Sequence, residues 1–254
     1  MLRNFELIVY KSYADLKAEA ERSYLGFVWW LLEPVLYLGA FYVLFVLVLQ
    51  RGGDRDFVPF FLCGTVVWKW FDSAIRGGSH AIAANNGLFQ QVYVPKYIFP
   101  VISLLGSTAR FLVVFFVFLL FLLVYGKSPA ATWLAAPMVM LTEFCLLVGL
   151  TMLVSAITPF LPDLRAAIEH GMMLLFFLSG VFFDIHTAPE RVRDYLVLNP
   201  MAVVIDEYRN VLLRGIWPNW ERLLLVFVFS LVIGYLALSI LRVFDRQYGK
   251  VRFS

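Results

Sequence analysis

Apolar residues in this chain gather into six long runs separated by polar stretches, and the runs cover residues 28–49, 57–75, 100–125, 133–158, 166–183 and 222–243. A membrane-spanning helix needs about 20 mostly apolar residues, because it rises about 1.5 Å per residue through roughly 30 Å of hydrocarbon. Every run reaches about that length, the fifth only barely. The pattern predicts an all-α integral membrane protein with six transmembrane helices, in which residues 1–254 form a single domain.

Residues 1–27 show the periodicity of an amphipathic helix. Charged residues fill one part of its surface, and the other part carries Phe5, Ile8, Val9, Ser12, Tyr13 and Leu16 at helical spacing. We expect this helix to lie at the membrane interface. The alternative is a solvated helix packed on another protein, and different faces of one helix can do both.

The last long polar stretch, residues 184–221, also contains helical signals. Pro189 and Pro200 each stand where a first helical turn can begin, and Asn199 is a good N-cap residue. Gly215 can end the second helix. We therefore expect two short re-entrant helices that lie in or dip into the outer leaflet.

The composition excludes a water-soluble globular domain. The chain is 61% hydrophobic and 15% charged, and its mean hydropathy is +0.80, whereas soluble domains are about 45–50% apolar and about 25% charged. Cys63 and Cys145 both lie in apolar runs, where a free thiol packs as a small hydrophobic group. The charged first turns do not fit a cleaved signal peptide.

Positive charge indicates which side of the membrane each loop occupies. Eleven Lys and Arg residues lie in the two termini, the second loop and the fourth loop, whereas the short loops on the opposite side hold three. Positively charged residues are enriched in cytoplasmic segments. The N-terminal helix, the loop 76–99 and the tail 244–254 are therefore expected in the cytoplasm, and the loop 184–221 outside.

The sequence shows no chemistry of its own. A phosphate-binding loop would read G-x-x-x-x-G-K-[ST], and the nearest match, Gly126 to Ser128, has Phe121 at the first glycine position. Ser179 has no histidine at similar depth in a neighbouring span. Three histidines fall in three different segments without metal-ligand spacing, namely His80, His170 and His186. We expect neither catalysis nor a bound metal or cofactor.

Two ionisable residues lie deep in predicted spans, where each charge costs roughly 2.5–3.5 kcal/mol. Arg110 and Glu143 are both ten residues into their spans, so both fall near the midplane of adjacent antiparallel helices. They are expected to form an ion pair, which either staples the two helices or contributes to substrate passage.

Aromatic and charged residues mark the first two spans. Along the first, Trp29, Glu33, Tyr37 and Phe41 recur every four residues on one ridge. The inner part of the second holds Trp68, Lys69, Trp70, Phe71 and Asp72. Rings beside polar groups suit a passage for sugars, because pyranose faces stack on rings and hydroxyls need hydrogen-bond partners. The alternative for Trp29, Trp30, Trp68 and Trp70 is the aromatic belt of a membrane interface.

Residues 76–100, RGGSHAIAANNGLFQQVYVPKYIFP, look like a surface that another protein grips. Three sequence blocks then resemble one family, the membrane subunit of type-2 ABC exporters for polysaccharides and polyol phosphates. They are RSYLGFVWWLLEPVL at 22–36, FLCGTVVWKWFDSAI with NNGLFQQVYVPKYIFP within 61–100, and NPMAVVIDEYRNVLL at 199–213. The resemblance covers nearly the whole chain, and the blocks stand in the family's order.

This resemblance implies a homodimeric permease in the bacterial inner membrane, with two copies of a separate cytoplasmic ATPase that binds ATP and Mg. It places a coupling helix at about Ser79 to Gln91, and the residues expected at the ATPase are Ser79, His80, Ala83, Asn85, Asn86, Gly87, Leu88, Phe89, Gln90 and Gln91. The candidate channel or gate residues are Trp29, Glu33, Tyr37, Phe41, Trp68, Lys69, Phe71, Asp72, Arg110, Glu143 and Tyr208.

The resemblance also implies the cargo, a lipid-linked polysaccharide exported from the cytoplasm. O-antigen is the first expectation, capsular polysaccharide the second and teichoic acid the third. One alternative keeps the architecture but moves a drug or a small lipid. Another is a channel or scaffold that never meets an ATPase. No feature indicates a nucleic-acid partner.

Overall fold

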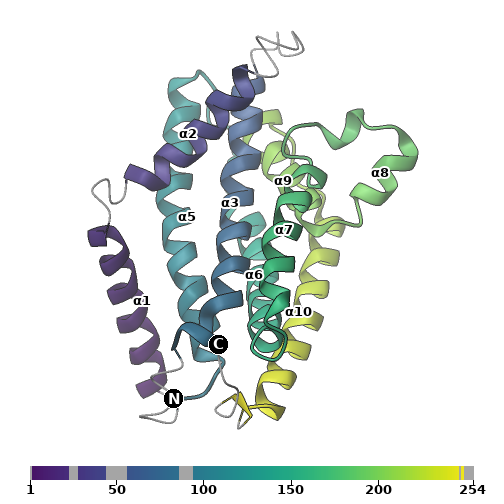
Figure 1. Cartoon of the computed structure of the whole chain (residues 1–254). Coiled ribbons are helices and arrows are strands. Elements are labelled where there is room, and N and C mark those ends of the chain that lie inside the picture. The colour runs from purple at the N-terminus through teal and green to yellow at the C-terminus, as the bar shows by residue number, and fades with distance from the viewer. Residues whose placement is uncertain (1, 23–27, 44–55, 86–93, 246, 249–254) are drawn as a thin grey trace.

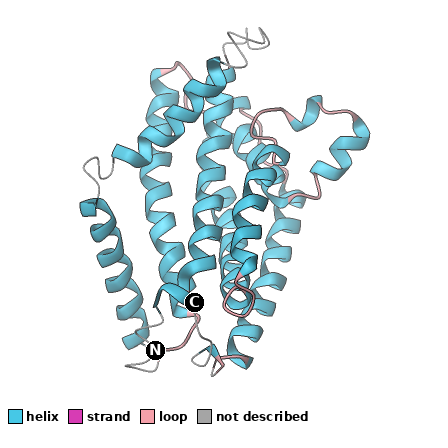
Figure 2. Cartoon of the chain, viewed as in Figure 1, coloured by secondary structure: helices cyan, strands magenta, loops and turns pink. Residues whose placement is uncertain are grey.

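The computed structural model describes residues 2–22, 28–43, 56–85, 94–245, 247 and 248. All regular elements in these residues are helices, and the long ones stand side by side in one bundle (Figures 1 and 2). The α-helices are α1 Leu2–Arg22, α2 Val28–Tyr42, α3 Phe57–Ala81, α5 Ile98–Val124, α6 Ala136–Ile157, α7 Asp163–Leu178, α8 Glu190–Leu196, α9 Pro200–Arg209 and α10 Trp220–Val243. Short turns are η2 Ala83–Asn85, η3 Ala131–Ala135, η4 Ile185–Thr187 and the π-helical η5 Asn210–Arg214. The expected all-α architecture is confirmed.

Three helical stretches among the described residues are both long and apolar enough to cross a membrane: Ile98–Val124, Ala131–Ile157 and Trp220–Val243. The helix α3 has 25 residues but carries several charged side chains. The helix α7 ends at Leu178, five residues before the predicted end of its run, because the chain turns at Gly180, whose φ is +70°. The six-span count stays a prediction.

The two termini lie at the same end of the bundle (Figure 1). The ends of α3 and α10 and the start of α5 lie there too, while α8 and α9 lie at the opposite end (Figure 1).

The helix α3 runs through the centre and contacts α5, α6, α7 and α9. Beside it, α6 and α10 make the most extensive helix contact of the described chain. Their backbones approach closely at Gly149, where an added Cβ would lie 2.9 Å from the carbonyl oxygen of Ser230 and 3.1 Å from the amide nitrogen of Gly234. Small residues at such a crossing allow tight van der Waals packing in a membrane.

The short helix α9 is wedged into the bundle, and every residue from Met201 to Arg209 is buried. It begins as the sequence predicts, since the Asn199 side chain accepts a hydrogen bond from the amide of Met201 and Pro200 follows. The π turn after it ends at Gly215, whose φ is +67°.

The helix α1 packs beside α5 at the end that holds the termini (Figure 1). Ile8 contacts the apolar cluster around Phe99, and Ser12 is 7% exposed. Val9, Tyr10 and Tyr13 point away from the bundle and are exposed. One side of the predicted amphipathic helix therefore covers the bundle, and its place at the membrane interface stays a prediction.

Candidate functional site

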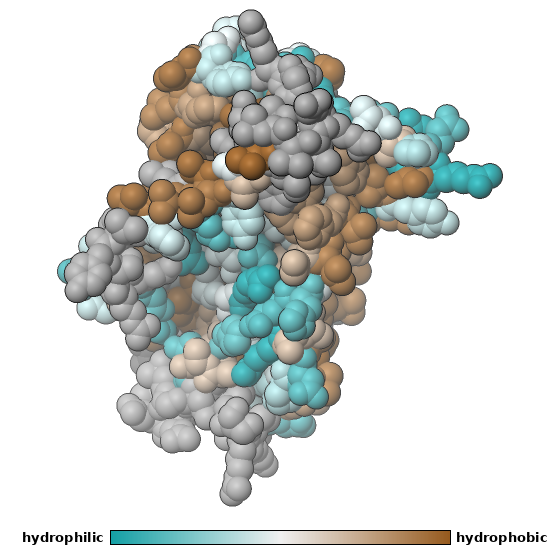
Figure 3. All heavy atoms as spheres, turned by 45° about the horizontal axis from the view of Figure 1, so that its top comes forward, coloured by the Kyte–Doolittle hydropathy of each residue, from teal (hydrophilic) through white to brown (hydrophobic). Residues whose placement is uncertain are grey.

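A polar stripe follows one side of α3. Lys69, Asp72, Arg76 and His80 follow one another at intervals of three or four residues, and Ser73 is four residues after Lys69, so all five share one face of the helix. The opposite face is apolar and belongs to the main core. Figure 3, which looks onto this side, shows hydrophilic residues gathered below α2 between hydrophobic surfaces.

The upper end of the stripe is tied to α2. Lys69 Nζ lies 2.5 Å from Glu33 Oε1 and 4.8 Å from the centre of the Tyr37 ring. An ammonium group on an aromatic face gains electrostatic attraction, and pairing with a carboxylate lowers the cost of a charge in an apolar environment. The structure thus brings together three predicted channel residues.

The lower part of the stripe reaches α7. Asp72 Oδ1 accepts a hydrogen bond from Arg76 Nε at 2.7 Å, and Arg76 Nη2 donates to the backbone carbonyl of Glu169 at 3.2 Å. His80 Nε2 lies 3.9 Å from the Glu169 carboxylate. The sequence reasoning did not select Ser73 or Arg76 as site residues, although their spacing from Lys69 and Asp72 was a usable signal.

Arg110 lies between two hollows beside the stripe. One, of about 300 Å³, lies under α2 and is lined by Trp29, Trp30 and Glu33. The other, of about 230 Å³, lies between α1 and the helices α3 and α5. Arg110 lines both, its Nη2 donates to Ser73 Oγ at 3.1 Å, and its guanidinium carbon lies 6.0 Å from the centre of the Trp30 ring.

The predicted ion pair between Arg110 and Glu143 is not formed. Glu143 is fully buried, and its carboxylate lies beside the Tyr208 hydroxyl rather than beside Arg110. It acts electrostatically on Tyr208 of α9 and on Cys63 of α3 instead. The two residues share a depth but point to different neighbours, so Glu143 belongs to the core.

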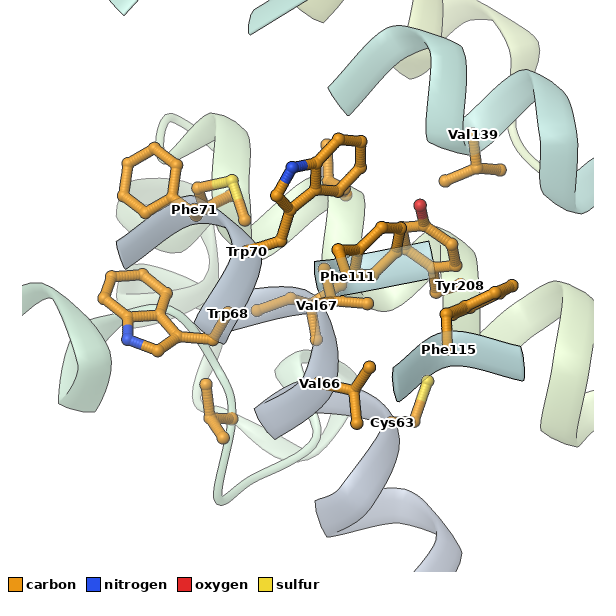
Figure 4. Packing of buried hydrophobic residues seen from close by; sticks show 14 of the residues in the cluster. Cys63, Val66, Val67, Trp68, Trp70, Phe71, Phe111, Phe115, Val139 and Tyr208 are labelled. Atoms are coloured by element: carbon orange, nitrogen blue, oxygen red, sulfur yellow. The ribbon is translucent and has the colours of Figure 1, made fainter. Parts of the chain in front are cut away.

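Several predicted channel aromatics are also core residues. Trp70 stacks on Phe111 with ring centres 4.0 Å apart, and Tyr208 lies edge-on to Phe115 at 5.8 Å (Figure 4). Trp68 is 3% exposed and packs against the Phe71 ring. Trp68 and Trp70 are too deeply buried for an interface belt, but Trp70 also lines the hollow of about 300 Å³ under α2, so a sugar-facing role stays a prediction. The side chain of Phe41 lies outside the described residues.

The predicted coupling segment is described only at its start. The helix α3 continues through Ala81, six residues beyond the predicted end of its span. Ser79 faces α6 and is 2% exposed, and its carbonyl accepts a hydrogen bond from Thr158. In this conformation the Ser79 side chain is therefore not available to a partner. His80 is exposed, and Ala83 and Asn85 are half-buried. Asn86, Gly87, Leu88, Phe89, Gln90 and Gln91 lie outside the described residues.

A buried arginine fastens the opposite end of the bundle. Arg209 is 1% exposed, and its guanidinium donates to the carbonyls of Gly180 at 2.6 Å, Val181 at 2.8 Å and Phe60 at 3.2 Å. It also lies 3.4 Å from the centre of the Phe60 ring. The sequence reasoning did not select Arg209, because its partners are backbone carbonyls far away in the chain.

Beside it, Arg214 bridges two carboxylates. Its Nη1 lies 2.8 Å from Asp206 Oδ1 and its Nη2 lies 2.6 Å from Asp184 Oδ2. Burial alone would lower the pKa of Arg214, but the two carboxylates outweigh it and raise that pKa. His186 joins this cluster at 3.0 Å from Asp206, so three possible metal ligands meet around a guanidinium that neutralises one of the two carboxylate charges, and Arg222 Nη1 lies 4.0 Å from Asp206 Oδ2.

The family of the chain follows from comparison with known proteins. The family model of the ABC-2 type transporter matches residues 12–213, so the chain belongs to this family of transporter membrane proteins. The resemblance found in the sequence is thereby confirmed.

Relatives that match along nearly their whole length are polysaccharide transport proteins. The O-antigen export system permease protein RfbA of Klebsiella pneumoniae is 24% identical over 248 residues, which cover 97% of this chain and 95% of the relative. RfbA of Myxococcus xanthus is 28% identical over 228 residues, with 89% and 87% covered. The polysialic acid transport protein KpsM of Escherichia coli is 25% identical over 240 residues, with 90% and 89% covered.

Proposed function

We propose that this chain is the permease subunit of an ATP-driven exporter that moves a lipid-linked polysaccharide, most simply an O-antigen, out of the cytoplasm. The observation that carries the proposal is the polar stripe on α3 with its two adjoining hollows. Several charged side chains along one helix are costly in a membrane, and such residues mark substrate paths or pair with one another. Membership of the ABC-2 family and the names of the relatives support the same function.

The proposed topology has six crossings with both termini in the cytoplasm of a bacterial inner membrane. The common position of the termini and of the start of α5 supports it (Figure 1). On this reading α8 and α9 face outward, and the second and fourth loops, which hold Arg76, Lys96 and Arg165, face the cytoplasm.

The proposed partners are a second copy of this chain and two copies of a cytoplasmic ATPase, which bind ATP and Mg. The docking segment would start at the exposed side of His80 and continue through η2 to Gln91. We propose that closure of the ATPase subunits pushes on this segment and opens a path between the two permeases, along which the stripe on α3 offers hydrogen bonds to sugars. Arg110, between the two hollows, would meet the anionic phosphate of the lipid carrier.

Substrate stimulation separates the candidate cargoes. The permease purified with its ATPase should show faster ATP hydrolysis when polyprenyl-linked glycan is added, and no comparable response to hydrophobic drugs. The reverse preference would support a drug or small-lipid permease. If no ATPase co-purifies although residues 79–91 are intact, a channel or scaffold becomes the better reading.

Charge exchange tests the contact between α2 and the stripe. Lys69→Glu should place two carboxylates face to face at Glu33, loosen α2 and lower export, whereas Lys69→Glu combined with Glu33→Lys should partly restore export. The measurement is glycan reaching the cell surface at equal permease level. The same exchange at Lys11 and Asp15, an exposed pair on α1 at 3.2 Å, serves as the control and should change little. A double variant no better than Lys69→Glu alone would contradict the role of this pair.

A further inference from the structure

The chain beyond α10 folds back under the bundle. The amide of Gln247 donates to the carbonyl of Phe244 at 2.8 Å, and this turn carries Tyr248 inward until it is fully buried. The Tyr248 hydroxyl donates to the carbonyl of Ala156, at the end of α6, at 2.9 Å. Burial, with a smaller contribution from Asp245, raises the pKa of this hydroxyl well above its usual range, so it remains a donor at physiological pH.

Ring packing holds this tail in place. The Phe160 ring lies 4.9 Å from the Tyr248 ring and 5.6 Å from the Phe244 ring, measured between centres. Tyr248 shares one buried cluster with Ile82, which follows the last residue of α3 and is 1% exposed. Ile82 lies within the proposed docking segment, so the tail packs in one core with the start of that segment.

The same tail touches the chain just after that segment. Asp245 Oδ1 accepts a hydrogen bond from the backbone amide of Lys96 at 3.2 Å, two residues before α5 begins. Lys96 is 4% exposed, and its Nζ donates to the carbonyl of Val94 at 3.1 Å. Tyr97, the residue that follows, packs against the cluster around Tyr248.

We propose that Phe244, Asp245, Gln247 and Tyr248 form a brace that joins the start of the docking segment to the chain just after it and transmits the movement of the segment to α6 and α10. The inference rests on the proposed function and adds positioning residues to it, chiefly Tyr248 and Asp245. Besides the brace, a push on the segment reaches the bundle through the ends of α3 and α5 and through the hydrogen bond from Thr158 to the Ser79 carbonyl.

The route beyond the brace follows existing contacts. The helices α6 and α10 form the tightest pair in the bundle, so a displacement at one end is carried along both. At the opposite end both contact α9, which Arg209 fastens to α3 and to the turn after α7. The brace thus lies at the start of a continuous packed path from the docking segment to the end of the bundle that we propose faces outward.

The test uses the full permease purified with its ATPase and reconstituted in vesicles that contain polyprenyl-linked glycan. Three quantities are measured: ATPase bound per permease, the rate of ATP hydrolysis, and glycan transported per ATP hydrolysed. Tyr248→Ala and Asp245→Ala should leave the first two near wild type and lower the third about fivefold, as loss of a coupling contact does. Tyr248→Phe keeps the ring and should lose less, and Asp245→Asn keeps an acceptor and should stay near wild type.

The control is Tyr235→Ala, which removes an exposed tyrosine of α10 and should change none of the three quantities. If Tyr248→Ala does not accumulate in the membrane, the partly exposed Asp245 still decides the question. Unchanged glycan per ATP in Asp245→Ala would overturn the brace, and so would a loss explained fully by lost ATPase binding. If the wild-type complex neither binds an ATPase nor moves glycan, the proposed function is wrong. The proposal of the brace, which rests on that function, is then wrong as well.

Discussion

Replacing Arg209 with alanine is expected to destabilise the bundle by about 3–5 kcal/mol, because each buried carbonyl that loses its donor costs about 1–3 kcal/mol. The guanidinium donates to the carbonyls of Gly180, Val181 and Phe60, all within 3.3 Å. Its removal leaves buried acceptors without donors and opens a cavity beneath the Phe60 ring. Because these carbonyls belong to the turn after α7 and to α3, while Arg209 itself lies in α9, the outward end proposed for the bundle should loosen as a whole. The measurement is the apparent Tm of the purified permease in detergent.

Two further variants separate geometry from charge at this site. Arg209→Lys keeps the charge but cannot reach three carbonyls with one ammonium group, so it should recover only a small part of the loss. Gly64→Ala should also destabilise, because the new Cβ would lie 2.6 Å from Arg209 Nη2. Arg191→Ala, at an exposed position on α8, is the control and should stay within about 0.5 kcal/mol of wild type. A stable Arg209→Ala protein with an unchanged Tm would refute this account.

Gly149→Leu should separate α6 from α10 and lower the amount of folded permease strongly. Any Cβ at this position meets backbone atoms of Ser230 and Gly234 at 2.9 and 3.1 Å, and backbone cannot turn aside as a side chain can. Overpacking of a well-packed core costs about 1–3 kcal/mol for small insertions, and an isobutyl group between two backbones exceeds that case. Gly149→Ala should show the same effect in weaker form.

The matched control is Gly106→Ala on α5, where an added Cβ meets nothing within 4 Å. This change should be neutral or stabilise slightly, since alanine is the better helix former. Both proteins are compared by their level in membranes and by size-exclusion elution in detergent. Normal elution and yield of Gly149→Leu would show that the contact between α6 and α10 can relax.

Sequence periodicity was sufficient for the helices and several of their ends. The apolar runs predicted α3, α5, α6 and α10 with ends within a few residues of the observed ones. The exception is the C-terminal end of α3, where the helix is longer than predicted. Local capping signals predicted the start of α9 at Asn199 and the turn at Gly215. These features depend on neighbours in the chain, so the sequence contains their cause.

The candidate site was only partly accessible from the sequence. Lys69, Asp72 and Glu33 were found because charges in apolar runs are conspicuous, and the structure joins Lys69 to Glu33 at 2.5 Å. The pairing of Arg110 with Glu143 was wrong. Counting residues along a span measures depth, whereas a contact also requires that the two helices turn their side chains toward each other.

By itself, the sequence determined that this protein is an all-helical membrane protein and indicated which end is cytoplasmic, because hydrophobic length and the placement of positive charge are properties of the chain alone. The tertiary structure decided which polar residues face outward and which are core. From the sequence, Trp70 and Tyr208 are candidates for the channel, but packing buries both side chains. Arg209 has no distinguishing signal in the sequence, yet three backbone carbonyls distant in the chain accept hydrogen bonds from it. The physical reason is that side-chain direction depends on helix rotation, and packing against other helices sets that rotation.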